Sequence, residues 1–379
     1  MIEITRKENC CGCAACVSIC PKKCITMKAD MEGFDYPNLN PVNCIHCDLC
    51  EKACPILNTS MSPKSSAKGY IAYSRNTDIR LSSSSGGIFT EIANKVIALG
   101  GVVFGAAFDE HYLVHHVMID NIESLNLIKG SKYLQSRIEN TYREAESLLK
   151  KNRLVLFVGT ACQIAGLKGY LNKNYSNLVT VDILCHGVPS PKVWLKYVEE
   201  IRNNRKVQSI SFRDKETGWK NYSISFRFDD NSSVKMKYWD NIYMRLFIEN
   251  INLRPSCYFC RFKNIPRLSD ITLGDCWGVE HHTPEMDDDK GTSIIIVNTE
   301  MGGKVLSAVT DNLEIKEAEI DLILPSWADA RKSASPHRKR RQFFKEIDKV
   351  HSLNDFSKLL TPSIKSRIRN IVKRFVISD

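Results

Sequence analysis

The sequence predicts two folded parts, a small α+β module rich in cysteine and a larger α/β domain with a mixed sheet and an antiparallel β insertion. Ten of the 15 cysteines lie between Cys10 and Cys54, which sets the first part apart. From about residue 67 onward, short apolar runs end in turns rich in Gly, Cys and Ser, and helical patterns follow them. This order is typical of α/β domains, whereas the apolar–polar alternation between residues 208 and 237 is typical of antiparallel strands.

The composition is that of a folded protein. The chain has 379 residues, of which 43% are hydrophobic and 25% charged, and at about 150 residues per domain this length predicts two to three domains. Its longest nearly unbroken apolar run, residues 96–108, is shorter than the roughly 18–20 residues that cross a bilayer. The first residues lack the apolar core of a secretory signal, so we expect a cytoplasmic protein.

The net charge of +10 lies in the C-terminal tail. Residues 331–379 hold 14 Lys/Arg and 4 Asp/Glu, so the first 330 residues sum to zero. A neutral body with a basic tail does not favour nucleic-acid binding, which needs a basic face on a folded module. We therefore expect no nucleic-acid partner.

Two cysteine runs of identical spacing carry the strongest functional signal. The first reads Cys10-x2-Cys13-x2-Cys16-x3-Cys20-Pro21, and the second reads Cys44-x2-Cys47-x2-Cys50-x3-Cys54-Pro55. This spacing is typical of bacterial ferredoxins with two 4Fe-4S clusters, in which the fourth cysteine of each run ligates the other cluster. We therefore expect cluster one on Cys10, Cys13, Cys16 and Cys54, and cluster two on Cys44, Cys47, Cys50 and Cys20.

Zinc and disulfides explain these runs less well. A structural zinc site uses pairs of CxxC and has no role for a third cysteine at +3 or a fourth at +4 before proline. Disulfides need an oxidising compartment. Cys11 and Cys24 fall outside the pattern, and we expect them to be spare thiols. Two such clusters pass single electrons, so the partner in that exchange should lie later in the chain.

Strands and helices alternate after a polar linker around residues 59–66. The predicted strands are Gly69–Tyr73, Val102–Phe108, Leu154–Val158 and Leu178–Leu184, and the predicted helices are one starting at Ile88, Ile164–Leu171, Pro191–Arg202 and Asn241–Asn250. Ser209–Arg213 and Tyr222–Arg227 are the predicted antiparallel strands. Open α/β sheets bind ligands at the carboxyl ends of their strands, which directs attention to the turns at those ends.

Several of these turns resemble the coenzyme F-420 hydrogenase/dehydrogenase beta-subunit family. The matching segments, in the family's order, are Ser83–Gly87, Gly159–Gln163, Cys185–Ser190, Arg254–Cys260 and Ser269–Asp275. They spread over roughly residues 67–300, and a ferredoxin module is a common attachment there. Two departures are Ala161, where the family usually has proline, and Cys276 before Trp277. The resemblance implies an FAD-containing iron–sulfur oxidoreductase, and archaeal members of the family pass electrons between clusters, FAD and a deazaflavin.

The later cysteines suggest a third 4Fe-4S cluster. Cys257 and Cys260 form a CxxC corner, while Cys162 and Cys185 each follow a buried strand at the same sheet edge. The resemblance points to these four together, with Cys276 as a reserve ligand. Zinc at the CxxC pair and simple buried thiols are the alternatives. Arg254 and Arg267 flank the pair, and we expect them to offset the charge of an anionic cluster.

A flavin site is predicted at a Ser/Gly turn. Gly86 and Gly87 at a helix start would let backbone amides approach a phosphate, and Ser83, Ser84 and Ser85 add hydroxyl groups. The alternative is an ordinary loop. Lys132 is a candidate partner for the flavin or its phosphate and is otherwise a solvated lysine. His186 follows a candidate ligand cysteine and would donate to a cluster or a flavin, or pack in the core.

The whole chain then divides into four regions. We expect an α+β ferredoxin-like N-terminal module in residues 1–58, a linker in residues 59–66, an oxidoreductase domain in residues 67–330 and a basic tail in residues 331–379. Within the tail, Ile364, Ile368, Ile371, Val372 and Phe375 share one face of a predicted basic amphipathic helix. Such a helix either docks on the protein or a partner, or lies on the inner face of a membrane.

These features predict an iron–sulfur flavoprotein. A redox protein such as ferredoxin would exchange single electrons with the clusters, and FAD would exchange a hydride with a small organic substrate, since a flavin carries two electrons. The catalytic residues and the substrate are not indicated. The alternatives are a non-catalytic electron-transfer subunit of a larger complex and an iron–sulfur scaffold without flavin.

Overall fold

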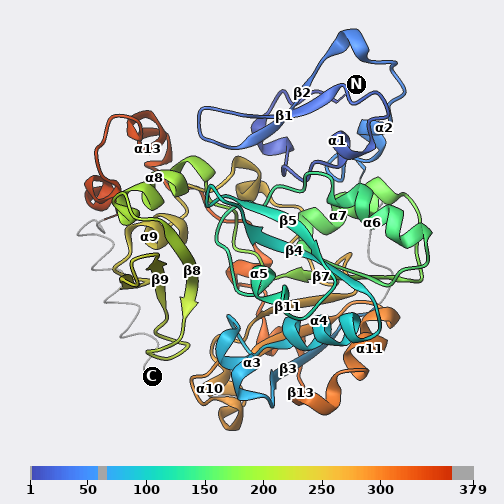
Figure 1. Cartoon of the computed structure of the whole chain (residues 1–379), viewed down its shortest axis with the longest axis vertical. Coiled ribbons are helices and arrows are strands. Elements are labelled where there is room, and N and C mark those ends of the chain that lie inside the picture. The colour runs from blue at the N-terminus through green and yellow to red at the C-terminus, as the bar shows by residue number, and fades with distance from the viewer. Residues whose placement is uncertain (1, 59–65, 361–379) are drawn as a thin grey trace.

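The computed structural model describes residues 2–58 and 66–360. The N-terminal module, at the top of Figure 1, contains helices α1 (Ala15–Ile19) and α2 (Leu49–Lys52) and an antiparallel hairpin of β1 (Ile25–Ala29) and β2 (Asp35–Leu39). Short 3-10 turns precede each cysteine run, η1 (Lys7–Asn9) and η2 (Pro41–Asn43). The module therefore has α+β character, as expected.

An eight-stranded mixed sheet forms the centre of the second part, which confirms the predicted α/β class. The strand order is β13-β3-β12-β11-β7-β6-β4-β5. The bounds are β3 Lys68–Ser74, β4 Val102–Phe108, β5 Val114–Ile119, β6 Val155–Thr160, β7 Leu178–Ile183, β11 Ile271–Asp275, β12 Ser293–Val297 and β13 Leu313–Glu317. Strands β4, β6, β7 and β11 are parallel neighbours, and antiparallel strands flank them on both sides.

Strand β3 runs in the same direction as the parallel strands, although β12 lies between them. It pairs antiparallel with β12, and β12 pairs antiparallel with β11. The carboxyl ends of β3, β4, β6, β7 and β11 therefore meet at one edge of the sheet. This topology brings the Ser/Gly turn, which follows β3 by a short helix α3 (Thr77–Ser82), to the edge where the later cysteines lie.

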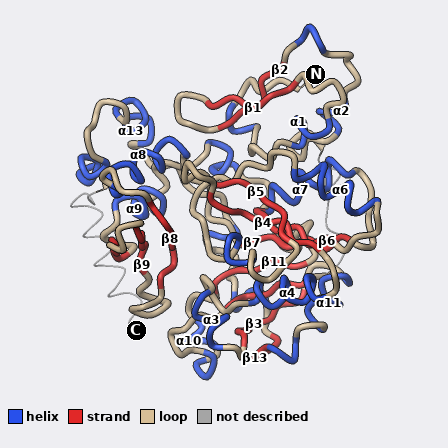
Figure 2. The backbone as a smooth tube through the Cα atoms, in the orientation of Figure 1, coloured by secondary structure: helices blue, strands red, loops and turns tan. Residues whose placement is uncertain are grey.

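Helices cover both faces of this sheet (Figure 2). Alternate strand residues divide the core, so that Val103 and Leu156 pack with α4 (Ile88–Ala98) and α11 (Glu300–Ser307), whereas Phe104 and Phe157 pack with α6 (Thr141–Lys150) and α7 (Ala161–Leu171). Helix α7 begins at Ala161 rather than at the predicted Ile164. Cys162 consequently lies in the first turn of a helix.

The N-terminal module packs on α7 through two glycines. A Cβ added at Gly166 would come within 2.8 Å of the Cys13 Cβ, and one added at Gly169 would come within 2.4 Å of the Ala53 carbonyl oxygen. Cys13, Ala15 and Ala53 share one buried cluster with the sheet residue Phe157. The absence of side chains at these two positions of α7 thus lets the cysteine-rich module lie directly on the α/β domain.

The predicted antiparallel insertion is a separate three-stranded sheet. Its order is β10-β9-β8, with β8 Val207–Asp214, β9 Ser223–Phe228 and β10 Ser233–Lys237. Helices α8 (Pro191–Arg202) and α9 (Ile242–Ile248) pack against it around the fully buried Trp194. The tail helix α13 (Arg340–Glu346) adds Phe343 to the same core. Two of these strands follow the alternating pattern in the sequence, whereas β10 was not predicted.

The remaining short elements connect these parts. They are α5 (Leu125–Ile128), α10 (Val279–His282), α12 (Ile320–Ile323) and the 3-10 turns η3 (Pro255–Phe259), η4 (Pro284–Met286), η5 (Thr310–Asn312), η6 (Asp329–Arg331) and η7 (Leu353–Leu359). The predicted amphipathic helix around residues 364–375 lies outside the described residues. Within residues 2–58 and 66–360, no helix has the length and apolar character needed to cross a membrane.

Candidate functional site

The two cysteine runs fold as two copies of one loop. Four residues lie in the left-handed region, with φ of 70° at Gly12, 56° at Ala14, 53° at His46 and 56° at Asp48. These positions are equivalent in the two runs. Left-handed backbone costs a residue other than glycine about 1–2 kcal/mol, so three such residues at matched positions indicate a shared purpose. Successive amides in this kind of turn line a concave, anion-binding surface.

The fourth cysteine of the first run lies with the second run. A small cavity is lined by Cys20, Cys44, Cys47 and Cys50, together with Cys24. The Cys20 and Cys24 sulfurs are 3.3 Å apart, so Cys24, which we expected to be a spare thiol, lies beside a candidate ligand. The backbone amide of His46 donates to the Cys44 Sγ at 3.5 Å. This arrangement suits the crossed ligand pattern that the spacing predicts for cluster two.

The four candidate ligands of cluster one, Cys10, Cys13, Cys16 and Cys54, lie close enough together to influence one another's pKa. Burial, together with the neighbouring Cys10 and Cys54 thiolates, raises the pKa of Cys16 to about 12. Burial also raises the pKa of Cys54, and the charge of the neighbouring Cys10 thiolate contributes to this rise. Several thiols that oppose one another's ionisation are an unfavourable group by themselves. A positively charged iron core would stabilise the thiolate form of all of them.

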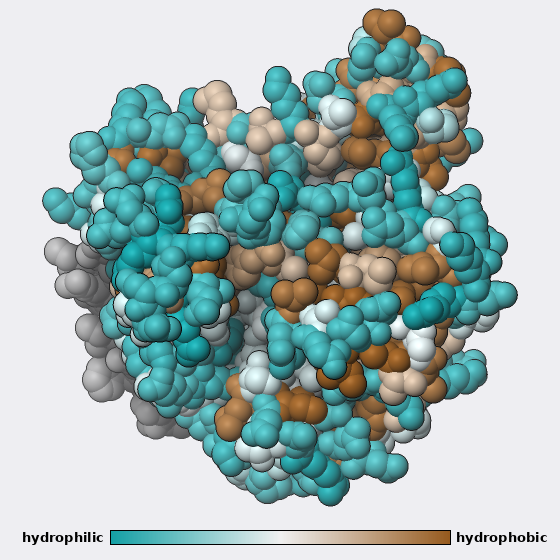
Figure 3. Space-filling view, viewed as in Figure 1, coloured by the Kyte–Doolittle hydropathy of each residue, from teal (hydrophilic) through white to brown (hydrophobic). Residues whose placement is uncertain are grey.

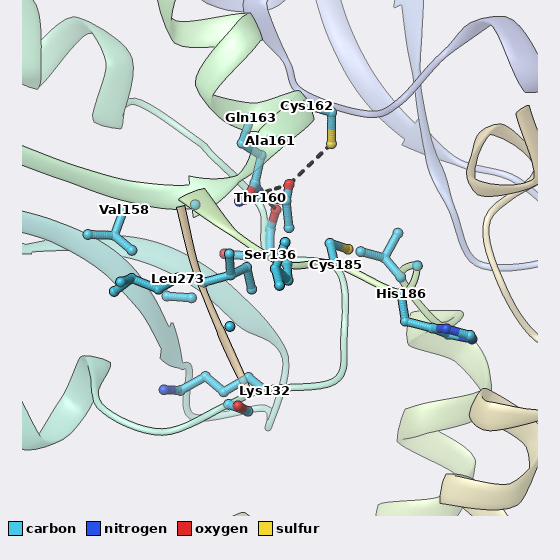
Figure 4. Close-up of a pocket in the computed structure, with 18 of the residues that line it drawn as sticks. Lys132, Ser136, Val158, Thr160, Ala161, Cys162, Gln163, Cys185, His186 and Leu273 are labelled. Atoms are coloured by element: carbon cyan, nitrogen blue, oxygen red, sulfur yellow. Dashed lines mark hydrogen bonds between the residues drawn. The ribbon is translucent and has the colours of Figure 1, made fainter. Parts of the chain in front are cut away.

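A larger cavity of about 310 Å³ opens at the carboxyl ends of the parallel strands. It is lined by most of the late candidate residues of the sequence analysis, namely Ser83, Ser84, Ser85, Gly87, Lys132, Cys162, Cys185, His186, Cys257 and Cys260. Figure 4 shows Cys162 at one end of this group and Lys132 at the other, with Cys185 and His186 at one side. Segments that are far apart in sequence thus converge on one space.

The four late cysteines come from three elements that end at this edge. Cys162 opens α7 after β6, Cys185 follows β7, and Cys257 and Cys260 lie in and just after η3. Burial raises the pKa of Cys185, and the neighbouring Cys257, Cys162 and Cys260 raise it further. Burial raises the pKa of Cys257 to about 12, again with contributions from Cys162 and Cys260. The four thiols are therefore close enough to interact electrostatically.

Cys276, the reserve ligand, does not line this cavity. It is 1% exposed and packs in a different core with Val279 and Met286. In the part of the chain that the structure describes, no three His, Cys, Asp or Glu side chains converge closely enough to hold a single metal ion. Cubane ligands bind four different irons and surround a cage rather than one ion.

The Ser/Gly turn is held rigidly at the cavity rim. The Ser85 hydroxyl donates to the Thr292 carbonyl oxygen at 3.0 Å, and the Ser131 amide donates to the Ser84 Oγ at 2.6 Å. Lys215 Nζ donates to the Ser85 carbonyl oxygen at 2.7 Å. Gly86 faces away from the cavity, since its amide donates to the Ser293 Oγ and an added Cβ would lie 2.6 Å from the Ala72 carbonyl oxygen.

Gly87 has a conformational role at the start of α4. Its φ is +90°, where it precedes the first residue of α4. An added Cβ would lie 3.1 Å from the Ile79 Cγ2 and 3.3 Å from the Ser74 Cβ. A larger residue here would therefore strain the turn.

Lys132 is a half-buried cation at the rim of the cavity. Burial lowers its pKa to about 7. Its Nζ donates only to carbonyl oxygens, those of Lys129 at 3.0 Å and Gly130 at 3.3 Å. No carboxylate within the described ranges forms an ion pair with it. An anion bound in the cavity would supply the missing negative charge.

Two histidines line the same cavity. His186 Nε2 lies 2.5 Å from the Asn250 Oδ1, and its ring contacts Phe247 edge-on. The sequence analysis missed His116, whose Nδ1 is 2.7 Å from the Ser136 Oγ and whose Nε2 is 2.9 Å from the Val158 carbonyl oxygen. Burial lowers the pKa of His116 to about 4, so it is neutral. No sequence pattern indicated a role for His116, because its partners Ser136 and Val158 lie in segments that are distant from it in the sequence.

Cys11 is the second cysteine that the sequence analysis undervalued. It lines the large cavity, and the neighbouring thiols of Cys13 and Cys162 both influence its pKa, which is raised well above the usual value. The nearby Cys11 thiol is the largest cause of the raised pKa of Cys162. Cys11 thus connects the first cysteine run of the module with the cavity of the α/β domain.

Two family models match separate parts of the chain. Residues 152–322 match the family model for the C-terminal part of the beta subunit of coenzyme F420 hydrogenase/dehydrogenase, and residues 9–57 match a 4Fe-4S dicluster domain. The chain is similar to a subunit of the F(420)H(2) dehydrogenase of Methanosarcina mazei, at 22% identity over 330 residues that cover 83% of this chain and 86% of the relative.

Two further similarities are more restricted. Over 55 residues, 13% of this chain and 42% of the relative, it is 38% identical to a subunit of the NADH-quinone oxidoreductase of Geobacter metallireducens. A chain of the F420-reducing NiFe hydrogenase complex from Methanosarcina barkeri aligns with a TM-score of 0.48 and 17% identity, over 77% of this chain and 92% of that chain.

Proposed function

From a chain whose residues 152–322 match the model of the coenzyme F420 hydrogenase/dehydrogenase beta-subunit family, and whose residues 9–57 match a 4Fe-4S dicluster domain, we propose an iron–sulfur flavoprotein with three clusters. The N-terminal clusters exchange single electrons with a redox protein, of which a ferredoxin is one candidate. The third cluster and FAD occupy the large cavity. The flavin exchanges two electrons with a small organic substrate or a deazaflavin coenzyme.

One observation carries this proposal. A single cavity is lined both by four converging cysteines and by the Ser/Gly turn with Lys132, and Cys11 of the N-terminal module reaches into the same cavity. Electron tunnelling falls off steeply with distance, so a one-electron wire and a two-electron cofactor must be neighbours. An arrangement of unrelated buried thiols would not require the two sets to share one space.

The chain's own residues have distinct tasks in this proposal. Cys162, Cys185, Cys257 and Cys260 hold the third cluster, while the crossed sets of the module hold the first two. The rigid turn at Ser83–Ser85 and the Lys132 ammonium bind an anionic part of the flavin. Neutral His116 keeps the position of the Ser136 hydroxyl in the lining. A bound flavin supplies the conversion between one-electron and two-electron chemistry.

The second candidate is an electron-transfer subunit whose substrate chemistry lies on a partner protein. The surface around the second cysteine run favours a protein contact, since Val42 is 89% exposed and Ile45 55% exposed beside the exposed Cys47. Figure 3 shows apolar side chains gathered at the outer end of the N-terminal module. The relative from Methanosarcina mazei is itself a dehydrogenase subunit. Both candidates need the same clusters.

Iron, sulfide and flavin content test the proposal directly. The anaerobically purified full chain should hold about 12 iron and about 12 labile sulfide, and denaturation should release one FAD. The Cys162→Ala and Cys257→Ala variants should each retain about eight iron. Cys276→Ala is the matched control and should keep the full content, because that thiol lies in another core.

The outcomes separate the alternatives. Eight iron in the wild type would remove the third cluster, and zinc in place of iron would overturn the cluster assignment. Absence of flavin after reconstitution would leave a flavin-free iron–sulfur scaffold. Flavin with no turnover by the isolated chain, using a one-electron reductant and organic acceptors, would favour the electron-transfer subunit.

A further inference from the structure

Arg254 is a fully buried cation at the junction between the N-terminal module and the α/β domain. It immediately precedes η3 and is 0% exposed. Its Nε donates to the Cys10 carbonyl oxygen at 2.8 Å, and its Nη2 donates to the Asp35 carbonyl oxygen at 2.9 Å and to the Cys10 Sγ at 3.5 Å. Its Nη1 donates to the Gln135 Oε1 at 2.9 Å. Although the sequence places Arg254 near the CxxC pair, its guanidinium is directed at the first cysteine run.

The partners of Arg254 do not neutralise it. In residues 2–58 and 66–360, no carboxylate lies within ion-pair distance of this guanidinium. Asp35 contacts Arg254 through its backbone carbonyl oxygen and not through its carboxylate. The guanidinium carbon lies 4.4 Å from the centre of the Tyr36 ring. A buried charge without a counter-charge is costly, which indicates that a further negative group belongs beside it.

Arg267, the other arginine near the CxxC pair, provides the contrast. Its Nη1 lies 3.2 Å from the Asp182 Oδ2, and both side chains are at most 2% exposed. Arg267 therefore has a counter-ion within the fold and needs none from a cofactor. Only Arg254 of these two combines an unneutralised charge with a direct contact to a candidate cluster ligand.

We propose that Arg254 raises the reduction potential of the first N-terminal cluster, through its charge and through the N–H···S hydrogen bond to Cys10. This inference rests on the proposed function, because it takes Cys10, Cys13, Cys16 and Cys54 as cluster ligands. A cubane with four thiolates is anionic and becomes more so on reduction. A nearby cation and hydrogen bonds to the sulfurs favour the reduced form.

The redox step that Arg254 influences is a one-electron transfer. The electron leaves a reduced donor protein, which is oxidised by one electron, and arrives on the first cluster, which is reduced by one. No proton moves with it, since the guanidinium remains protonated throughout. A higher reduction potential keeps the electron on the first cluster. From that cluster, Cys11 forms a short path to the large cavity.

Redox titration of the anaerobically purified full chain, followed by electron paramagnetic resonance, tests the proposal. The signal of the first cluster is the one that Cys16→Ala removes. In Arg254→Met, we expect reduction of that cluster to be at least tenfold less favourable, which is a shift of about 59 mV to more negative potential for a one-electron couple. Arg254→Lys keeps the charge but loses the planar fork and should shift the potential in the same direction by less.

Arg143 provides the matched control. Its Nε and Nη2 donate to the Ser18 and Val17 carbonyl oxygens at 2.8 and 3.0 Å, so it also joins the module to the α/β domain, yet it makes no hydrogen bond to a cysteine sulfur. Arg143→Met should leave the potential unchanged. An equal shift in Arg143→Met, or a shift of another cluster's signal instead, would overturn the proposal.

Iron content distinguishes this inference from the proposed function beneath it. A wild type without clusters contradicts the proposed function. A wild type with its clusters, and an Arg254→Met variant with equal iron and an unshifted potential, contradicts the role of Arg254 alone. Should Arg254→Met fail to assemble, Arg254→Lys decides: a negative shift supports the proposal, and an unchanged potential overturns it.

Discussion

Glu32, at the tip of hairpin β1–β2, is held by Arg340 of the tail helix α13 in a two-pronged ion pair. Arg340 Nη1 lies 2.9 Å from the Glu32 Oε1, and Nη2 lies 2.5 Å from Oε2. The Ser190 hydroxyl donates to the Glu32 carbonyl oxygen, and Lys192 Nζ donates to the Met31 carbonyl oxygen at 3.0 Å. The tail thus fastens the N-terminal module at the tip of its hairpin.

Glu32→Ala should loosen this fastening. The two side chains of the pair are 18% and 16% exposed, and hydrogen bonds to charged groups contribute about 1.5–3 kcal/mol. We expect a loss of this size in the free energy of unfolding and faster amide exchange in β1 and β2, measured by hydrogen–deuterium exchange. Glu199→Ala, which removes an exposed pair with Arg202, is the control and should cost less than about 1 kcal/mol. Equal effects of the two variants would contradict a fastening role.

Cys24 should substitute for Cys20 on the second cluster. Because the two sulfurs are 3.3 Å apart and share one cavity, Cys20→Ala alone should retain much of the second cluster. The Cys20→Ala/Cys24→Ala double variant should lose it and keep the first cluster, as seen by iron content and electron paramagnetic resonance. Cys24→Ala alone is the control and should be unaffected. Complete loss of the second cluster in the single Cys20→Ala variant would show that Cys24 cannot reach the iron.

Local patterns explain which features the sequence could predict. Helix α8 was predicted with both ends correct, because Ser190 accepts from the Val193 amide and Pro191 begins the helix. The cysteine runs were recognisable because their ligands repeat at short intervals. The early start of α7 was missed since its Thr160–Gln163 capping box was not recognised.

Contacts between segments that are distant in the sequence could not be predicted from such local patterns. The Glu32–Arg340 pair, the position of Arg254 on Cys10 and the reach of Cys11 to Cys162 each join segments that only the folded chain brings together. The position of the Ser/Gly turn beside the late cysteines could nevertheless be predicted, because the carboxyl ends of strands that run in the same direction meet at one edge of the sheet. The intervening β12 does not change this, since two antiparallel pairings restore the strand direction.

Lys132→Met should stabilise the ligand-free protein and weaken flavin binding. Burial lowers the pKa of Lys132 from 10.5 to about 7, so between these values the unfolded chain binds more protons than the folded one. Burying the charged Lys132 therefore lowers the free energy of unfolding by an amount on the order of a few kcal/mol. This loss of stability is complete below about pH 7 and disappears as the pH rises toward 10.5. Thermal unfolding at pH 6.5 should therefore show a more stable variant, with a smaller rise in stability toward pH 9.

Flavin affinity should fall with rising pH, whereas the stability of the ligand-free protein rises. A protonated Lys132 attracts an anionic ligand, so wild-type affinity should fall as the pH rises through about 7, and Lys132→Met should bind weakly without this dependence. Isothermal titration of the reconstituted apo-flavin protein measures both. Lys95→Met, on the exposed part of α4, is the control. A pH-independent wild-type affinity equal to that of Lys132→Met would remove Lys132 from the flavin site.

Cys11→Ser should slow electron transfer between the N-terminal module and the large cavity. Cys11 and Cys162 line the same cavity and influence each other's pKa, and Cys11 belongs to the same turn as the candidate ligands Cys10 and Cys13. A serine hydroxyl is smaller and less polarisable than a thiol, so it leaves a gap on this short path, and tunnelling across a gap is slower. Stopped-flow absorption after mixing with a reduced redox protein should show normal reduction of the N-terminal clusters and delayed reduction of the flavin.

Iron content distinguishes a role of Cys11 in the electron path from a role as a cluster ligand. If Cys11 only forms the path, Cys11→Ser keeps about 12 iron per chain and loses speed. If the variant drops to about eight iron, Cys11 is itself a ligand of the third cluster, and one of the four late cysteines is not. Cys24→Ala is the matched control, a thiol outside the ligand pattern that does not line the large cavity, and its electron transfer should match the wild type. Unchanged speed with unchanged iron in Cys11→Ser would mean that electrons enter the cavity elsewhere, with Cys13 beside Gly166 of α7 the next contact to examine.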